Sequence, residues 1–335
     1  MAAYTTIDDS EANFQVKLFT GTGASGSTTA VTLDGSTDLS PNLVWVIHRN
    51  AAGNWKGVAD TIRGVEKGLH SNSDEGQADS DEYLTAFGSD GFTVGENGSW
   101  GANNVNYVSL CWNESATAGF DIVDYDGNGS NRTISHSLSA VPHAMIIKEY
   151  SHDTNWACYH RGKGNTHFIK LNANDAPEAT DNFQDTDPTS SVFSVGTGGQ
   201  TNNSSRDYIN YLFTSVQGFS SFGSFIGNGN ADGPMVFTGF EPAFVILKYL
   251  GDNGKMWYGM TNKQSNQGGF NPIDKFNVLS GTEAEQSETI CDFLANGFKI
   301  TTTQSDINDS GEVIGYYAWA RAPFVNSNGV PANAR

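Results

Sequence analysis

The stretch PNLVWVI, residues 41–47, decides the fold of this chain. It opens on a proline and continues as an unbroken apolar run, which is typical of a β-strand covered on both faces. Proline fits the first position of such a strand, because that residue need not donate a hydrogen bond to the ladder. The run recurs as PHAMII at 142–147 and as PAFVIL at 242–247. One strand framework is therefore predicted to occur three times.

Further anchors recur in the same order around each proline. A Gly-x-Gly turn precedes it, a tryptophan follows it, and an aromatic-rich strand closes the unit. The turns begin at Gly21, Gly127 and Gly227, the tryptophans are Trp55, Trp156 and Trp257, and the closing strands reach Trp112, Phe213 and Trp319. We expect a polar N-terminal arm at 1–15, repeats at 16–114, 115–217 and 218–324, and a C-terminal tail at 325–335.

The composition indicates an all-β protein. The chain has 38 glycines and 12% aromatic residues, but only 16% charged residues. Many turn formers and many aromatics favour short strands over helices. Segments such as YVSLCW and FDIVDY alternate in the manner of half-exposed strands. Each repeat is predicted to be a β-sandwich of about 100 residues, built from short strands.

The recurring strands predict where the repeats touch. Residues 44, 46, 145, 147, 245 and 247 are expected to fill one face of these strands. Their neighbours at 43, 45, 47, 144, 146, 244 and 246 are expected to meet a neighbouring repeat or another subunit, since an apolar face left in water would be a large exposed patch. Trp55, Trp156 and Trp257 are predicted to be buried core residues, with a sugar-stacking platform as the alternative.

The net charge of −19 argues against two classes of partner. Nucleic acids and anionic membrane surfaces need clustered Lys and Arg, and the sequence has no such cluster. No signal peptide and no apolar run of membrane-spanning length are recognised. The odd, sparse set Cys111, Cys158 and Cys291 predicts three unpaired thiols and folding in a reducing cytoplasm.

Enzymatic activity is not predicted. The sequence has no G-x-S-x-G motif, and no nucleophile, metal or carboxylate constellation repeats with the framework. A carboxylate pair for glycoside hydrolysis stays open, because its separation is a three-dimensional property. The seven histidines are interpreted as scattered surface residues rather than zinc ligands; they are His48, His70, His136, His143, His152, His160 and His167.

One segment resembles the start of a calcium loop. In DYDGNGS, residues 124–130, Asp124, Asp126 and Asn128 alternate like calcium ligands. The twelfth position is Ser135, where such a loop requires Glu, and the corresponding residues of the other repeats are apolar or neutral. A plain turn without metal is therefore preferred, and no cofactor is predicted. Calcium at this turn is the open alternative.

The segments between each tryptophan and the next strand differ most between the repeats. They span 56–91, 157–192 and 258–297. Segments that vary on a repeated framework are typical of loops that contact partners. These three segments are the predicted binding regions.

The chain resembles repeat-containing virion proteins of tailed bacteriophages, many from marine hosts. The resemblance rests on YTTIDDSEANFQVKLFTGTG at 4–23, on GFTVG at 91–95, and on DGPMVFTGFEPAFVILK at 232–248. The last of these segments and DFLANGFKITTTQSDINDSGEVIGYYAWARAPF at 292–324 are the closest matches. The resemblance implies a virion structural protein, tail-fibre-like, with a role in host attachment or assembly. It implies other virion proteins and further copies of the chain as partners, and a host glycan or protein as receptor. The alternatives are a capsid decoration protein and a stand-alone lectin.

Overall fold

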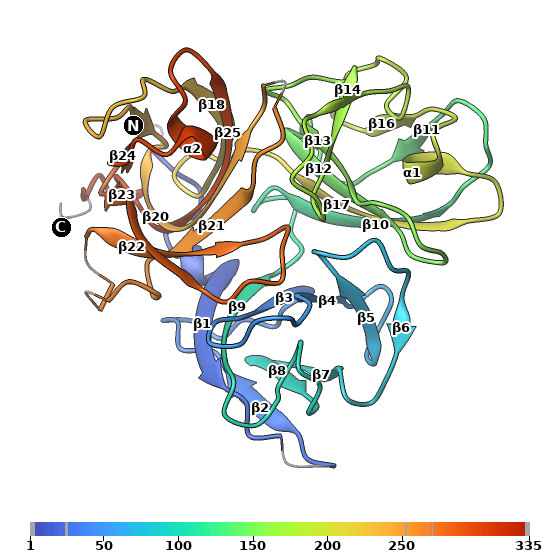
Figure 1. The fold of residues 1–335 in the computed structure, drawn as a ribbon, viewed down its shortest axis with the longest axis horizontal. Coiled ribbons are helices and arrows are strands. Elements are labelled where there is room, and N and C mark those ends of the chain that lie inside the picture. The colour runs from blue at the N-terminus through green and yellow to red at the C-terminus, as the bar shows by residue number, and fades with distance from the viewer. Residues whose placement is uncertain (1–3, 24–25, 252, 267, 270, 332–335) are drawn as a thin grey trace.

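The chain folds almost entirely as β-structure, which confirms the predicted all-β fold (Figure 1). The computed structural model describes residues 4–23, 26–251, 253–266, 268–269 and 271–331. Helical structure in this part of the chain is limited to three short turns: η1 (Ser10–Ala12), α1 (Gly199–Asn202) and α2 (Ser305–Asn308). None of these helices has the length or the apolarity to cross a lipid bilayer.

Three lobes surround a common centre, and each is built on one main sheet (Figure 1). The first lobe contains β1 to β9, the second β10 to β17 and the third β18 to β25. The main sheets begin in the orders β1-β9-β3-β4-β5, β10-β17-β12-β13-β14 and β18-β25-β20-β21-β22. Corresponding strands therefore occupy corresponding places in all three lobes. The repeat boundaries 16–114, 115–217 and 218–324 themselves stay predictions.

The bounds of the strands are as follows. The first lobe has β1 (Phe14–Thr20), β2 (Thr29–Thr32), β3 (Leu43–His48), β4 (Gly57–Asp60), β5 (Lys67–His70), β6 (Ala78–Asp79), β7 (Leu84–Gly88), β8 (Gly91–Val94) and β9 (Asn106–Trp112). The second has β10 (Phe120–Asp126), β11 (Arg132–Ser135), β12 (Ala144–Glu149), β13 (Ala157–His160), β14 (His167–Lys170), β15 (Glu178–Ala179), β16 (Val192–Val195) and β17 (Asp207–Phe213). The third has β18 (Ser220–Ile226), β19 (Met235–Phe237), β20 (Phe240–Tyr249), β21 (Trp257–Thr261), β22 (Ile273–Val278), β23 (Gln286–Leu294), β24 (Gly297–Ile300) and β25 (Val313–Pro323).

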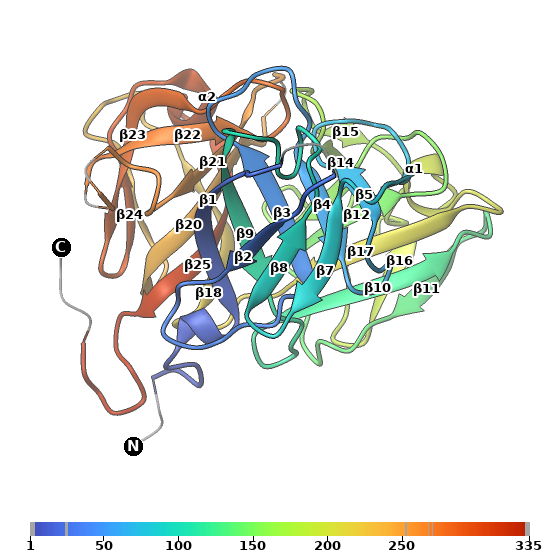
Figure 2. The same ribbon diagram turned by 90° about the horizontal axis from the view of Figure 1, so that it is seen from below.

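Each recurring apolar strand is buried on both faces, as its sequence predicts. In β3, Val44 and Val46 pack into a core that belongs to the first lobe alone. This core lies between the main sheet and the small sheet β2-β8-β7, which crosses it in Figure 2. Leu43 and Trp45, on the other face of β3, belong to a core shared by all three lobes. Burying an aliphatic side chain is worth roughly 1.5–3 kcal/mol. Burial of the face that carries Leu43 and Trp45 therefore strongly favours packing of the lobes against each other.

The closing aromatic residues of the three lobes meet at the centre. Trp112 and Phe213 end β9 and β17, Trp319 lies within β25, and each pairs with the recurring strand of its lobe. Their ring centroids lie 6.2 Å apart for Trp112 and Phe213, 5.4 Å for Phe213 and Trp319, and 5.3 Å for Trp112 and Trp319. Three equivalent positions thus form a closed triangle, which explains why the same strand framework appears three times.

Hydrogen bonds between neighbouring lobes follow the same cycle. The ammonium of Lys148 in β12 donates to the carbonyl of Asp74 in the first lobe at 2.9 Å. Lys248, at the equivalent place in β20, donates to the carbonyl of Asp175 in the second lobe at 3.2 Å. Lys56 in the first lobe donates to the carbonyl of Gly281 in the third. All three lysines are fully buried, and burial lowers the pKa of each ammonium to about 8.

The N-terminal segment lies against the body of the protein. Thr5 and Ile7 are buried, and the Thr5 hydroxyl donates to the carbonyl of Gln217 at 2.8 Å. Strand β1 begins at Phe14, inside the segment predicted as a polar arm. Ser327, near the other end of the chain, donates its backbone N–H to Asp8 at 2.7 Å. The described parts of both ends are therefore joined to each other and to the lobes.

Candidate functional site

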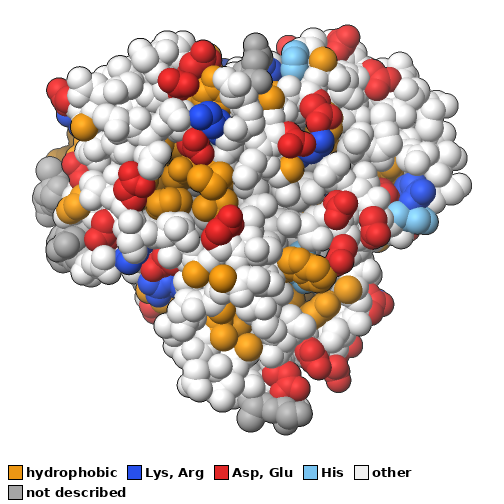
Figure 3. Space-filling model, viewed as in Figure 1, with side chains coloured by type: hydrophobic (Ala, Val, Ile, Leu, Met, Phe, Trp, Pro, Cys, Tyr) orange, Lys and Arg blue, Asp and Glu red, His pale blue; other side chains and the backbone are white. Residues whose placement is uncertain are grey.

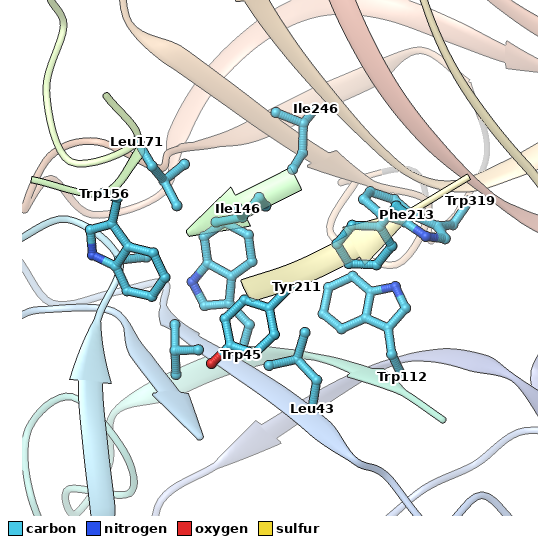
Figure 4. Close-up of a pocket in the computed structure, with 12 residues that line it drawn as sticks. Leu43, Trp45, Trp112, Ile146, Trp156, Leu171, Tyr211, Phe213, Ile246 and Trp319 are labelled. Atoms are coloured by element: carbon cyan, nitrogen blue, oxygen red, sulfur yellow. The ribbon is translucent and has the colours of Figure 1, made fainter. Parts of the chain in front are cut away.

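A small cavity lies at the junction of the lobes (Figure 4). Its free volume is about 20 Å³, enough for roughly one water molecule. The lining is almost entirely apolar and includes Trp45, Trp112, Trp156 and Trp319. A space of this size and character is an incompletely filled core between three sheets. We therefore assign it a structural role and no ligand.

The candidate calcium residues lie on an exposed turn. The carboxylate of Asp124 accepts a 3.0 Å hydrogen bond from the hydroxyl of Tyr150, while Asp126 is exposed and its backbone carbonyl accepts from Arg132. The amide oxygen of Asn128 accepts from the backbone N–H of Ser130 at 2.9 Å. Within the described residues, no group of three or more His, Cys, Asp or Glu side chains is arranged to hold a metal ion.

A buried asparagine holds this turn. The Asn202 side chain donates to the carbonyls of Ser130 at 2.7 Å and Gly196 at 2.8 Å, and its amide oxygen accepts from the backbone N–H of Asn128 at 3.0 Å. Asn308 makes the same three contacts in the third lobe, to Asn230, Thr302 and Asn228. In both lobes the amide joins the two ends of the turn to a neighbouring loop. Neither asparagine was singled out by the sequence, because two of the three partners of each lie more than 70 residues away.

The prediction for the tryptophans is right for two and wrong for one. Trp156 and Trp257 are each 1% exposed, whereas Trp55 is 36% exposed. In the first lobe Val46 pairs with Gly57, while Ile147 of the second lobe pairs with Ala157, so the first turn is one residue longer. Lys56 consequently takes the buried place of Trp156, and Trp55 is displaced to the surface.

The predictions for the histidines and for the cysteines have different outcomes. His48, His70 and His160 are buried, so the interpretation of the histidines as surface residues is wrong for these three. Burial lowers the pKa of His70 and of His160 to about 4. The three cysteines are unpaired, as predicted, and all three are buried.

A concave surface in the third lobe is lined by both apolar and acidic side chains, and we call it the β21–β22 groove. It has a volume of about 350 Å³. In the space-filling view an apolar area over β21 and β22 has acidic side chains around it (Figure 3). The groove is lined by Met256, Tyr258, Phe276, Val278, Glu283, Gln286, Glu288, Gln304 and Asp306. Six of these nine residues fall within the predicted binding segment 258–297.

Two stacked aromatic rings form the floor of the groove. Tyr258 on β21 and Phe276 on β22 lie 4.6 Å apart with an angle of 24° between their planes. Tyr258 is 2% exposed, and its hydroxyl makes no hydrogen bond to any described residue. The sequence did not predict the groove, because Gln304, just before α2, and Asp306, within α2, reach it from outside the variable segment.

The polar rim of the groove carries negative charge. Burial raises the pKa of the Tyr258 phenol, and the charges of Asp306 and Glu288 raise it further. Asp306 is paired with Lys255 at 3.4 Å. Glu288 accepts hydrogen bonds of 3.0 and 2.8 Å from the neutral side chain of Gln304. The groove thus combines an apolar floor, an unpartnered hydroxyl and carboxylates, which is an arrangement suited to binding.

The fold and this groove define an all-β protein whose three lobes share one core and whose third lobe has a ligand-sized groove. The chain belongs to the family described as a domain of unknown function (DUF7483), which matches residues 9–323. The match covers all three lobes together. No curated protein and no solved structure matches the chain.

Proposed function

We propose that the protein is a non-enzymatic surface component of a bacteriophage virion, associated with the tail and acting in host attachment or virion assembly. The observation that carries this proposal is the single core shared by the three lobes. A shared core holds the loops of all lobes in fixed relative positions. That rigidity supports a role as a scaffold that meets large partners, and the resemblance to virion proteins supplies the setting.

The proposed partners follow from the same setting. They are other virion proteins, further copies of this chain, and a glycan or protein on the host surface. The segments 56–91, 157–192 and 258–297 remain the proposed contact regions. The protein would be made in the host cytoplasm and reside in the virion, and we propose neither a catalytic role nor a cofactor.

Capsid decoration is the second candidate. The cyclic lysine contacts give the three lobes a rough threefold arrangement. A chain with this arrangement suits a position of local threefold symmetry on a capsid. A stand-alone lectin is less well supported, since Trp156 and Trp257 are buried and only Trp55 is open to a sugar.

Electron microscopy of virions that carry a C-terminal epitope tag on this chain separates these roles. Gold label on the tail is the expected result. Label over the head would replace the tail assignment by decoration. Purified particles without label, with the tagged protein left in the soluble fraction, would overturn the virion role. A glycan array with the wild type and Trp55→Ala tests the lectin candidate.

A further inference from the structure

We infer that the β21–β22 groove binds an organic cation, meaning an ammonium or guanidinium group on an aliphatic stem. This inference does not depend on the proposed virion role. It starts from a difference between the lobes, continues through the charge of the rim, and ends with the unpartnered hydroxyl of Tyr258.

The first lobe has no room for a ligand at the equivalent place. Tyr258 and Phe276 correspond in register to Gly57 and Gly68. A Cβ atom added to Gly57 would lie 2.5 Å from the Trp100 ring, and one added to Gly68 would lie 2.5 Å from the Tyr83 ring. Aromatic side chains from the covering loops therefore fill the space above these two strands.

The third lobe reverses this arrangement. The backbone pairing puts Ile307 at the place of Trp100, because Gly229 bonds to Asn308 as Gly23 bonds to Gly101. The strands now carry the aromatic rings, and the covering turn carries a smaller aliphatic residue together with Asp306 and Gln304. The two rings lie at the bottom of the groove and are themselves almost completely buried, while Met256 and the polar side chains above them reach its surface.

The rim favours a cation over a neutral or anionic ligand. Glu283, Glu288 and Asp306 contribute three carboxylates, and Lys255 pairs with Asp306 alone. Neither glutamate forms an ion pair with a described residue. The negative charge of Glu283 does act on buried Lys56, where it raises the pKa of the lysine ammonium against the larger lowering by burial. Lys275 lies on β22 but is bound to Ser287. A carboxylate that lacks a cation in the protein gains from a cation on the ligand.

The groove offers one apolar side chain and one hydroxyl to such a ligand. Met256 is only partly buried and can contact methylene groups. The Tyr258 ring is buried, but its hydroxyl can accept a hydrogen bond from an ammonium N–H. We place the charged group between Tyr258 and Glu288, with the stem along Met256.

Isothermal titration calorimetry on the full chain tests the site with four probes. Cadaverine and Nα-acetyl-lysine amide carry the ammonium, 1-pentanol is the neutral stem, and glucose is a neutral polyol. Binding of either cationic probe, with no binding of the neutral probes, is expected. If only the lysine derivative binds, the natural source is a protein side chain; if only cadaverine binds, it is a free amine. Binding of glucose alone would overturn the inference in favour of a saccharide site.

Two variants keep the test specific. Glu283→Gln combined with Glu288→Gln should weaken binding about tenfold, the loss expected for one charge-assisted hydrogen bond. Tyr258→Phe should weaken it less, with the fold unchanged by circular dichroism. The matched control is Asp81→Asn with Glu82→Gln, which removes two charges from a second acidic hollow, in the first lobe, that has no aromatic ring in its lining. Equal weakening in the control would show that the cation follows net charge and has no site in the groove.

Discussion

The phenol of Tyr211 in the second lobe donates a 2.8 Å hydrogen bond to Oδ2 of Asp60 in the first lobe. The same carboxylate oxygen accepts from Arg63 at 2.7 Å, and both charged side chains are almost completely buried. The Arg63 guanidinium also donates hydrogen bonds to the backbone carbonyls of Val58 and Lys67. The phenol thus links the second lobe to a buried ion pair of the first lobe.

Removing that phenol should weaken the junction of the lobes. Tyr211→Phe leaves part of a buried carboxylate without a partner, and we expect a loss of about 1–3 kcal/mol in the free energy of unfolding. Urea unfolding followed by tryptophan fluorescence measures it. The matched control is Tyr317→Phe, at the equivalent position of β25, where the buried hydroxyl has no partner among the described residues. A loss in the control as large as that in Tyr211→Phe would contradict this account.

The longer first turn predicts unequal roles for two tryptophans that look alike in the sequence. Trp156→Ala removes a fully buried indole that donates to the carbonyl of His70 at 2.9 Å. We expect it to cost about 3–5 kcal/mol. Trp55→Ala should cost much less, since its side chain is 36% exposed. Thermal unfolding of the two variants side by side gives the comparison, and equal losses would mean that Trp55 is a core residue in solution.

This pair of tryptophans shows where sequence reasoning succeeds and where it stops. The alternation within each recurring strand predicted both buried faces correctly, because side-chain direction follows the backbone repeat of two. The equal spacing of Trp55, Trp156 and Trp257 was misleading, because the length of a turn is not fixed by the strands that it joins. The β21–β22 groove was beyond reach for another reason. It exists because Ile307 stands where Trp100 stands in the first lobe, and that equivalence is visible only in the pairing of the strands.

The buried histidines predict a loss of stability in mild acid. His160 donates from Nε2 to the carbonyl of Tyr316 at 3.2 Å and accepts at Nδ1 from the backbone N–H of Gly162 at 3.1 Å, so the folded state holds it neutral. Its pKa is lowered from 6.5 to about 4 by burial. Between these two values the unfolded chain binds a proton that the folded chain does not bind. The contribution of neutral His160 to the free energy of unfolding is therefore fully present above pH 6.5. It is lost as the pH is lowered toward 4.

Urea unfolding at pH 7.5 and at pH 5 measures this effect. His70 and His160 should each contribute a loss of roughly 2 kcal/mol at pH 5. His160→Gln, which keeps a donor and an acceptor, should reduce the difference between the two pH values by about that amount, while His152→Gln on the surface should leave it unchanged. A pH dependence that is the same in all three proteins would mean that His160 titrates normally in the folded state.

The asparagine that holds the candidate calcium turn gives the last prediction. Asn202 is fully buried and makes three hydrogen bonds to backbone groups around the turn. Asn202→Ala would leave an N–H and two carbonyls without these partners, so we expect a loss of about 2–3 kcal/mol, at the upper end for a buried hydrogen-bonded group. Asp126→Asn is the control, because its side chain is exposed and should change stability by less than about 0.5 kcal/mol. Both are measured by thermal unfolding with 1 mM EDTA and with 1 mM CaCl₂, concentrations that bracket roughly the range of calcium sites. If calcium raises the melting temperature of the wild type and Asp126→Asn abolishes the rise, the turn is a metal site and the amide only supports it.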